Sequence, residues 1–352
     1  IGGIKLMAII DKPSDYFNTV LYSGTGNEQT VSGVNFQPDF TWLKSRTNAQ
    51  PNTLQNSVTG PTKQMHSNAN DAETSYTQLL KSFNSDGFVL GTDSFINQNG
   101  QNFVSWNWKA GGSASSNSNG SITTSISANQ DVGFSIVSYT GNNSNGATIG
   151  HGLGAAPNMV IIKKKSSTAQ WAVGGTNIDS TFNGYMFLDS TGAIATSDNV
   201  FNDTAPSSSV ITLGTTGDSN ANGQTYIAYC FHSVQGYSKF SSYIGNGNAD
   251  GPFIYTGFKP GFVIMKKSSG TGNWQLFDNK RNPFNVADRT LSPDVTDSEY
   301  TTEGDIDMLS NGFKIRSTGN INADGSTYLY MAFAEQPFVT STGNGSIPGT
   351  AR

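Results

Sequence analysis

The sequence predicts an all-β fold made of tandem antiparallel β-sandwich domains. Two features of the composition support this class: charged residues make up only 13% of the 352 residues, and glycine alone contributes 40. A chain that is poor in charge and rich in Gly, Asn, Ser and Thr favours short strands joined by turns and disfavours helices. The third observation is an internal repeat, because similar strand and turn patterns occur three times along the chain.

The clearest repeated element is a polar turn followed by an alternating strand. Asn99-Gly100 predicts a tight hairpin turn, and alternation puts Trp106 and Trp108 on one face of the next strand. The other copies have large apolar side chains at the same places, but these are Tyr, Phe and Met in place of Trp. We therefore predict a core strand and not a binding site. The copies are NQNGQNFVSWNW (97–108), NANGQTYIAYCF (220–231) and NADGSTYLYMAF (322–333).

The repeats divide the chain into three units, each large enough to bury one core. The stretch between the first two units is rich in Gly, Ser and Asn and predicts a flexible linker, whereas the second and third units follow each other directly and are expected to pack together. The predicted boundaries are an N-terminal lead at 1–15, a first sandwich at 16–110, the linker at 111–133, a second sandwich at 134–236, a third sandwich at 237–338 and a tail at 339–352.

The middle segments differ most between the units, so we expect recognition to reside in them. These segments are 48–82, 168–206 and 270–309. Within the first of them, YTQLLKSF (76–83) is compatible with a short helix.

The charge balance and the single cysteine exclude several classes of protein. The net charge of −5 argues against binding to nucleic acid, which needs a basic face. No apolar run reaches the roughly 18 residues of a membrane helix, and Cys230 alone cannot form an internal disulfide framework. At the N-terminus, IGGIKL precedes Met7 and lacks the layout of an export signal. We expect residues 1–6 to be translated upstream sequence and the native protein to begin near Met7.

Three turns resemble the first half of a calcium-binding loop: DSNANG (218–223), NGNADG (246–251) and NINADG (320–325). Such a loop also needs a bidentate acid at its twelfth position. That position holds Tyr229, Gly257 and Met331 in the three turns. We therefore interpret the motif as a pattern of hydrogen-bonded turns and predict no metal site. The alternative is a weaker calcium site that shares loop oxygens.

No constellation of residues predicts catalysis or a cofactor. His66, His151 and His232 lack the spacing of a metal site, and Cys230 has only His232 near it, with no orienting partner. A glycosidase would need two carboxylates in one cleft, but acids do not recur at matching places in the units. The acids considered for this role are Asp86, Asp93, Glu303, Asp305 and Asp307.

Two features of the strands are candidates for binding. Each unit has a basic strand end at the same place: KSR (44–46), KKK (163–165) and KK (266–267). These ends would protect a sheet edge, or would bind an acidic neighbouring subunit or an anionic polysaccharide. Trp171 and Trp274 follow the second and third basic ends at similar distances. They are the candidate glycan-binding residues, because sugars stack on exposed aromatic faces; the alternative is that both are core residues.

The repeat resembles one found in virion proteins of tailed bacteriophages, many of them phages of marine bacteria, which are described as tail-fibre-like or structural. The resemblance covers 16–338 and is strongest in SDYFNTVLYSGTGNEQTVSGVNFQPDFTWLKSRT and NGQNFVSWNWKAGG of the first unit. The family pattern often has Leu-Phe-Asp after the second strand, which Leu276-Phe277-Asp278 keeps and Leu54-Gln55-Asn56 keeps in part. The resemblance implies a jelly-roll or concanavalin-like β-sandwich outside a virion and transfers no catalytic residue.

These observations lead us to expect a non-enzymatic protein of the virion surface, made in the host cytoplasm and acting in host attachment as a tail-fibre or receptor-binding protein. The expected partners are other virion structural proteins, further copies of the chain (a trimer is one option) and a host surface glycan. Nucleic acid and membrane insertion are not expected. The alternatives are a capsid decoration or cement protein and a glycan-depolymerising spike enzyme.

Overall fold

The computed structural model describes residues 10–302 and 304–338, and strands dominate it: 43% strand against 3% helix. The described helices are the 3₁₀ helix η1 (Pro13–Asp15), α1 (Ser94–Asn97) and α2 (Asp198–Phe201). The predicted all-β class, with several antiparallel sheets, is therefore confirmed. The expectations for residues 1–6, for Glu303 and for the tail at 339–352 concern residues outside the described ranges.

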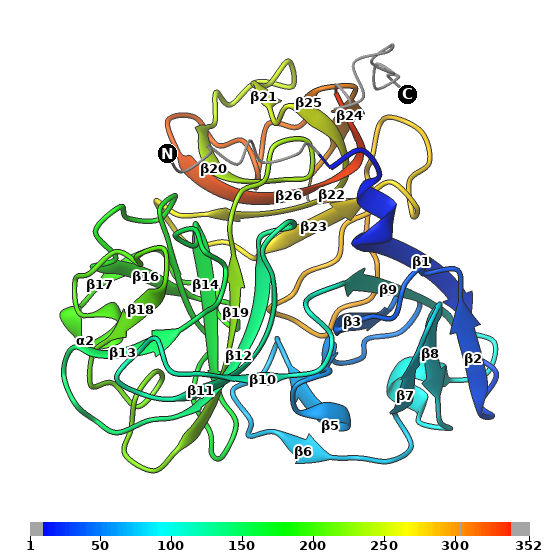
Figure 1. Cartoon of the computed structure of the whole chain (residues 1–352). Helices are drawn as coiled ribbons and strands as arrows, with labels where there is room; N and C mark the ends of the chain where they lie inside the picture. Colours follow the sequence, from blue (N-terminus) through cyan, green and yellow to red (C-terminus); the bar gives the residue numbers. More distant parts are fainter. Residues whose placement is uncertain (1–9, 303, 339–352) are drawn as a thin grey trace.

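The strands of the first repeat form two antiparallel sheets. They are β1 (Phe17–Ser23), β2 (Gln29–Ser32), β3 (Phe40–Ser45), β4 (Thr53–Asn56), β5 (Gly60–His66), β6 (Thr74–Ser75), β7 (Leu80–Asn84), β8 (Gly87–Leu90) and β9 (Asn102–Trp108). The larger sheet has the order β1-β9-β3-β4-β5-β6, and the smaller sheet has the order β2-β8-β7. Figure 1 shows this repeat as the blue and cyan lobe.

The second repeat also has a larger and a smaller sheet. Its strands are β10 (Ser115–Asn117), β11 (Thr124–Asn129), β12 (Phe134–Thr140), β13 (Ala147–Gly150), β14 (Met159–Lys164), β15 (Ala172–Gly175), β16 (Gly184–Phe187), β17 (Ala195–Thr196), β18 (Val210–Leu213) and β19 (Thr225–Phe231). The orders are β10-β11-β12-β19-β14-β15-β16-β17 and β13-β18. The prediction of a flexible linker at 111–133 is wrong, because β11 pairs with β12 and buries Ile126.

The third repeat has fewer strands than the others in the described part of the chain. Its strands are β20 (Ser238–Ile244), β21 (Phe253–Tyr255), β22 (Phe258–Lys267), β23 (Gln275–Asp278), β24 (Ile306–Leu309), β25 (Gly312–Ile315) and β26 (Thr327–Pro337). They form sheets with the orders β20-β26-β22-β23 and β21-β25-β24. The larger sheets of all three repeats thus contain one common arrangement: β1-β9-β3-β4, β12-β19-β14-β15 and β20-β26-β22-β23.

Two local predictions are wrong. The Asn99-Gly100 turn does not close a hairpin, because it connects α1 to β9, and β9 pairs with β1 on one side and β3 on the other. The segment 76–83 contributes to strand β7 and not to a helix. Leu80, at the start of β7, is buried and pairs with Leu90 of β8, so tertiary packing decides its conformation.

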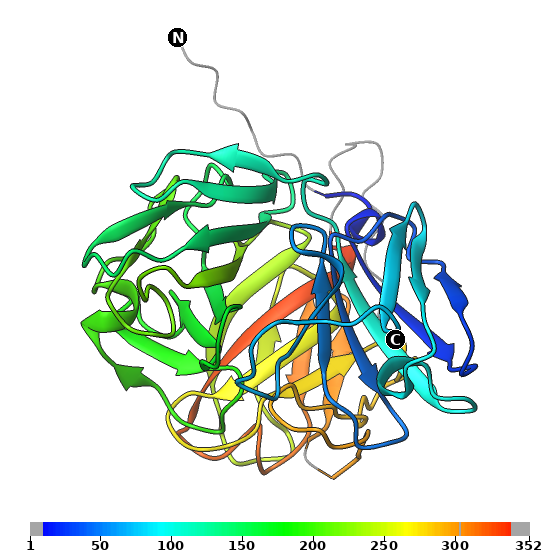
Figure 2. The same ribbon diagram turned by 90° about the horizontal axis from the view of Figure 1, so that it is seen from below.

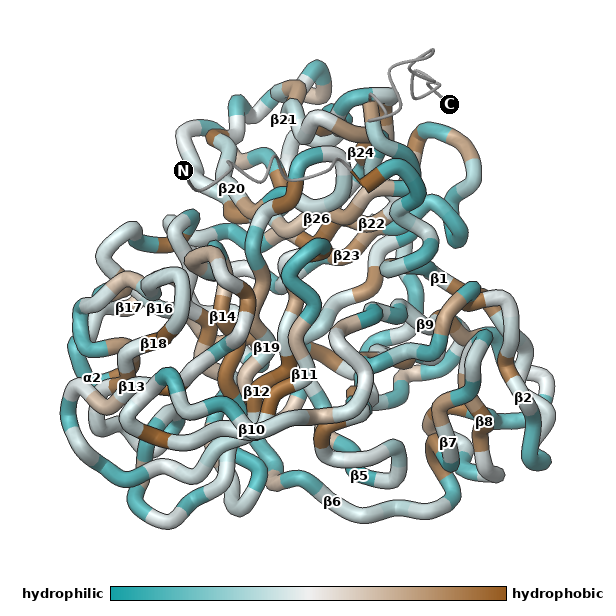
Figure 3. Tube along the Cα trace, in the orientation of Figure 1, coloured by the Kyte–Doolittle hydropathy of each residue, from teal (hydrophilic) through white to brown (hydrophobic). Residues whose placement is uncertain are grey.

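Each repeat has its own apolar core, and one further core is shared by all three. Alternation splits the last strands of the second and third repeats, β19 and β26, between the core of their own repeat and the shared one. The large side chains in the shared core are Trp106 and Trp108 of β9, Tyr229 and Phe231 of β19, and Met331 and Phe333 of β26. Figures 1 and 2 show three lobes around a common centre, and Figure 3 shows hydrophobic residues on the strands that face it.

The predicted core role of Trp106 and Trp108 is confirmed, since both side chains are 0% exposed. Their position differs from the expected one, because they pack between repeats and not between the two sheets of one sandwich. Phe17 and Phe262 contact Trp108 from the first and third repeats, with ring centroids 4.9 and 5.7 Å away. The repeats are therefore joined through their largest side chains.

Candidate functional site

One lysine of each repeat is buried at the boundary with another repeat. These interface lysines are Lys44, Lys163 and Lys266. They stand at matching places on β3, β14 and β22, each opposite an apolar residue of the last strand of the same repeat. Each is at most 1% exposed. A lysine is rarely buried so completely unless its charge is paired or hydrogen-bonded.

Each interface lysine donates hydrogen bonds from Nζ to backbone carbonyl oxygens of another repeat. The first repeat contacts the third, the second contacts the first, and the third contacts the second, so the contacts close into a ring. The distances are 2.7 Å from Lys44 to Thr296, 2.9 Å from Lys163 to Asn70, and 3.2 and 2.8 Å from Lys266 to Thr191 and Gly192. The ring ties every repeat to both of the others.

A backbone hydrogen bond follows the same ring two residues after each interface lysine. In each case the carbonyl oxygen of the first residue after the strand accepts from an amide in a loop of the other repeat. The bonds run from Glu299 N to Arg46 O at 2.9 Å, from Glu73 N to Lys165 O at 2.9 Å and from Ile194 N to Ser268 O at 3.1 Å. Because main-chain groups form this bond, it does not depend on the chemistry of the side chains, provided that the donor residue is not proline.

Burial lowers the pKa of all three interface lysines, to about 7 for Lys44 and to about 8 for Lys163 and Lys266. Desolvation disfavours the ammonium form. Nearby carboxylates oppose this effect, as Asp294 does for Lys266, and the carbonyl acceptors also favour the charged form. An ammonium group can donate to three acceptors at once, which suits a side chain that joins two repeats.

Both sequence interpretations of the basic strand ends are wrong for the interface lysines. β3, β14 and β22 each have a neighbouring strand on both sides and are not sheet edges. An anionic partner cannot reach these lysines, because their Nζ atoms are enclosed and bonded to carbonyl groups inside the molecule. Their charge serves cohesion between repeats.

Trp171 and Trp274, the candidate glycan-binding residues, also lie at boundaries between repeats. They are 0% and 2% exposed, so neither ring can stack on a sugar, and that prediction is wrong. Asn52 occupies the matching place in the first repeat. All three donate from the side chain to a carbonyl of another repeat: Trp171 Nε1 to His66 O at 2.9 Å, Trp274 Nε1 to Phe187 O at 3.1 Å and Asn52 Nδ2 to Ser292 O at 3.0 Å.

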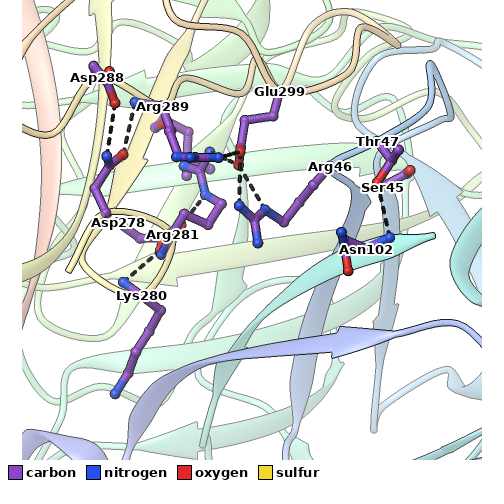
Figure 4. A network of polar contacts seen from close by, with 12 residues as sticks. Ser45, Arg46, Thr47, Asn102, Asp278, Lys280, Arg281, Asp288, Arg289 and Glu299 are labelled. Atoms are coloured by element: carbon purple, nitrogen blue, oxygen red, sulfur yellow. Dashed lines mark hydrogen bonds and ion pairs between the residues drawn. The ribbon is translucent and has the colours of Figure 1, made fainter. Parts of the chain in front are cut away.

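The boundary between the first and third repeats carries an additional network of charges (Figure 4). Glu299 accepts two hydrogen bonds from Arg46, each at 2.9 Å, and lies 2.8 Å from Arg289 and 3.2 Å from Arg281. Burial alone would raise the pKa of Glu299, but the three guanidinium groups outweigh it and lower the pKa to about 2. The carboxylate is therefore ionised at neutral pH.

Asp278 connects this network to the shared core. Its Oδ2 atom accepts from Arg281 Nε at 2.6 Å and from Trp106 Nε1 at 3.1 Å. The last residue of the Leu-Phe-Asp pattern thus makes a contact across repeats. Asn56, at the matching place in the first repeat, makes a related contact by donating from Nδ2 to Tyr229 Oη at 3.1 Å.

Two of the turns that resemble calcium loops, 218–223 and 320–325, contain a buried asparagine with a structural role. Asn97, Asn220 and Asn322 occupy matching places before the last strand and are all buried. Asn220 Oδ1 accepts from Asn142 N at 3.0 Å, and its Nδ2 donates to the carbonyls of Ser144 and Gly214. These hydrogen bonds show that the side-chain amide of Asn220 stabilises the turn. Within 10–302 and 304–338, no group of three or more His, Cys, Asp or Glu residues could hold a metal ion.

The other residues considered for catalysis have structural surroundings. Burial raises the pKa of Cys230 to about 12, so its thiol stays protonated at neutral pH. Burial also lowers the pKa of His151 to about 4. Asp93 caps α1, and Asp307 pairs with Arg316 at 2.6 Å. These side chains stabilise local structure in the positions where the structure places them.

Sequence reasoning placed the interface lysines in basic strand ends but missed their burial and their carbonyl partners, and it missed the pair formed by Arg46 and Glu299. A signal for the lysines was present, because each stands at the same place in a strand that is apolar on both faces. A fully buried strand can only keep a lysine whose ammonium has partners. No local signal identified Glu299 as a partner of Arg46, since the two residues lie 253 positions apart.

The geometry defines a class of protein: an all-β chain whose antiparallel sheets, consistent with β-sandwich domains, surround a shared core and are joined by buried polar contacts. The chain belongs to the family described as Domain of unknown function (DUF7483), whose model matches residues 12–337. This match includes nearly all of the three repeats. No curated protein and no solved structure matches the chain. None of the helices in the described part of the chain is long and apolar enough to cross a membrane.

Proposed function

We propose that this protein is a non-enzymatic structural protein of the outer surface of a tailed-bacteriophage virion, where it acts in host attachment. The observation that carries the proposal is the ring of interface lysines, which joins three sandwiches into one body. Such a body opens rarely and holds its surface loops in fixed positions for recognition. The resemblance of the repeats to tail-fibre-like virion proteins supports the location.

In this function the partners are other virion structural proteins and a glycan of the host surface. Several copies of the chain on one particle would bind with an effective concentration that exceeds the affinity of each site. The interface lysines and the Arg46–Glu299 pair are committed to contacts between repeats, so recognition falls to the outer surfaces of the lobes.

Locating the protein in intact virions tests this proposal. Gold-labelled antibodies against the chain, viewed by electron microscopy on purified particles, are expected to mark the tail tip. Label on the capsid face would replace attachment by capsid decoration, and absence of the chain from purified virions would contradict the proposal. Release of soluble sugar from host envelope glycan by the purified protein would contradict the non-enzymatic part.

A further inference from the structure

The outer sheet of the third repeat presents two aromatic rings to solvent. Phe253 and Tyr255 are the first and last residues of β21 and are 45% and 59% exposed, whereas Ile254 between them is buried. Residues two apart on a strand point to the same side and stand about 6.5 Å apart. The two rings therefore form a pair on the outward face of the sheet.

The other repeats do not have aromatic residues at these places. Tyr255 pairs with Gly312, just as Ser32 pairs with Gly87 in the first repeat and Gly150 pairs with Val210 in the second. Phe253 correspondingly matches Thr30 and Thr148. The same sheet therefore forms with small residues at both places, Thr and Ser in the first repeat and Thr and Gly in the second. Folding does not require the rings, and exposing them to water has a free-energy cost of its own.

The rings lie along the sheet. Phe253 extends across to β25, where its Cε2 atom is 3.1 Å from the point at which a Cβ atom of Gly312 would stand. Tyr255 lies back toward Gly257, with Oη 3.6 Å from the corresponding point. The missing side chains of these glycines leave room for the rings against the backbone. A ring in this position offers a flat face to a ligand.

Charged residues beside the rings are paired with one another. Asp250 contacts Lys314 at 2.7 Å and Arg316 at 3.5 Å, and Arg316 also contacts Asp307 at 2.6 Å. Two acids and two bases leave this part of the surface without net charge. It still contains hydrogen-bond donors and acceptors side by side, and a hydroxyl group can bond to both kinds.

We propose that the Phe253–Tyr255 face binds a neutral carbohydrate chain, an inference that rests on the proposed attachment function and identifies the surface that performs it. The C–H faces of sugar rings stack on the electron-rich faces of Phe253 and Tyr255. The hydroxyl groups exchange hydrogen bonds with the paired charges at the rim. Because these charges compensate each other, the face has no net charge with which to attract an anionic or a cationic polymer.

Affinity electrophoresis tests the proposal with the full chain, in native gels that contain hydroxyethyl cellulose, dextran or laminarin as neutral probes. We expect retardation by at least one probe. The double substitution Phe253→Thr and Tyr255→Ser, which installs the residues of the first repeat, is expected to weaken it by about tenfold or more. Tyr76→Ala, which removes an exposed ring of the first repeat, is the matched control and is expected to change nothing.

A transfer variant makes the test independent of folding defects. Thr30→Phe with Ser32→Tyr, added to the double variant, is expected to restore part of the retardation. The inference is overturned if no neutral probe retards the protein, if the double variant is retarded as strongly as the unaltered chain, or if the double variant instead dissociates an oligomer in sedimentation. Labelling of virions separates the two proposals: virion location without probe binding contradicts only this inference, and probe binding by a protein absent from virions contradicts only the proposed location.

Discussion

The first–third and second–third boundaries share an interface lysine and the backbone hydrogen bond two residues after it. We call these two contacts the frame of a boundary. The two boundaries differ in the charged residues around this frame. At the first–third boundary, the bond from Glu299 N to Arg46 O is accompanied by a bidentate ion pair between the two side chains. At the second–third boundary, the matching bond joins Ile194 and Ser268, which carry no charge. The frame therefore suffices to join two repeats. The charges are an addition that distinguishes one boundary from the others.

The first–second boundary is intermediate. Glu73 and Lys165 occupy the matching places there, and the charge of Lys165 counteracts the effect of burial, which raises the pKa of Glu73. Glu73 lacks the three arginines that surround Glu299. The series indicates that each boundary has acquired its own side chains around a constant frame.

The largest effect is expected from Arg281→Met, which breaks the charged boundary. Arg281 is fully buried and pairs with Asp278 and Glu299. Its loss leaves the buried Asp278 carboxylate without its ion-pair partner and removes one of the three arginines from Glu299, so we expect a destabilisation of about 3–5 kcal/mol. The free energy of unfolding from urea titration measures it. Adding Asp278→Asn should recover part of the loss, and a loss below about 1 kcal/mol would show that the network contributes little.

The next prediction compares the contribution of the interface lysine to stability at the two boundaries. Lys266→Met and Lys44→Met each remove an ammonium from a set of buried carbonyl acceptors, and each is expected to cost about 1–3 kcal/mol. The two losses in urea titration should be similar if the frame works independently of the charges around it. A much smaller loss for Lys44→Met would show that Arg46 and Glu299 replace the frame at the charged boundary.

A smaller effect is expected from Arg46→Ser, which gives the first repeat the residue that the third repeat has. Glu299 keeps Arg281 and Arg289, so we expect a loss of about 1–2 kcal/mol in thermal or urea unfolding. Lys81→Ser is the control, because the Lys81–Glu28 pair is exposed to solvent and should cost less than about 1 kcal/mol. Equal losses for the two variants would contradict the special role of the boundary.

The last prediction is a pH dependence of stability. The pKa of Glu299 is lowered from 4.5 to about 2 in the folded protein, so its contribution to stability is present above pH 4.5 and is lost as the pH falls toward 2. Urea titrations between pH 2 and 6 should therefore show the unaltered protein losing its advantage over Glu299→Gln. A constant difference between the two proteins across this range would contradict the ionised state of Glu299.

The sequence predicts the class of fold and the buried face of the last strand, because both depend on local patterns. Alternation shows that Trp106 and Trp108 are buried but not what covers them. The covering residues come from other repeats, as Phe262 does. The same limit explains why the role of Lys44 was not predicted. In the sequence it belongs to a basic strand end, and its acceptor Thr296 lies 252 positions away.

The wrong prediction of a glycan-binding site at Trp171 and Trp274 has a related cause. Trp171 and Trp274 follow basic strand ends in segments that differ between the repeats, and such segments are typical of surface recognition. Here these segments form the boundaries between repeats, so their aromatic residues are buried. Phe253 and Tyr255 were recognisable only once pairing showed which residues of the other repeats they match.

Native-state hydrogen exchange tests most directly whether the three repeats form one cooperative body. Lys266→Met alters only the second–third boundary. If the ring of contacts joins all three repeats, the best-protected amides of β9 in the first repeat should lose as much opening free energy as those of β19 and β26. Unchanged protection in β9, with losses confined to β19 and β26, would contradict the closed ring.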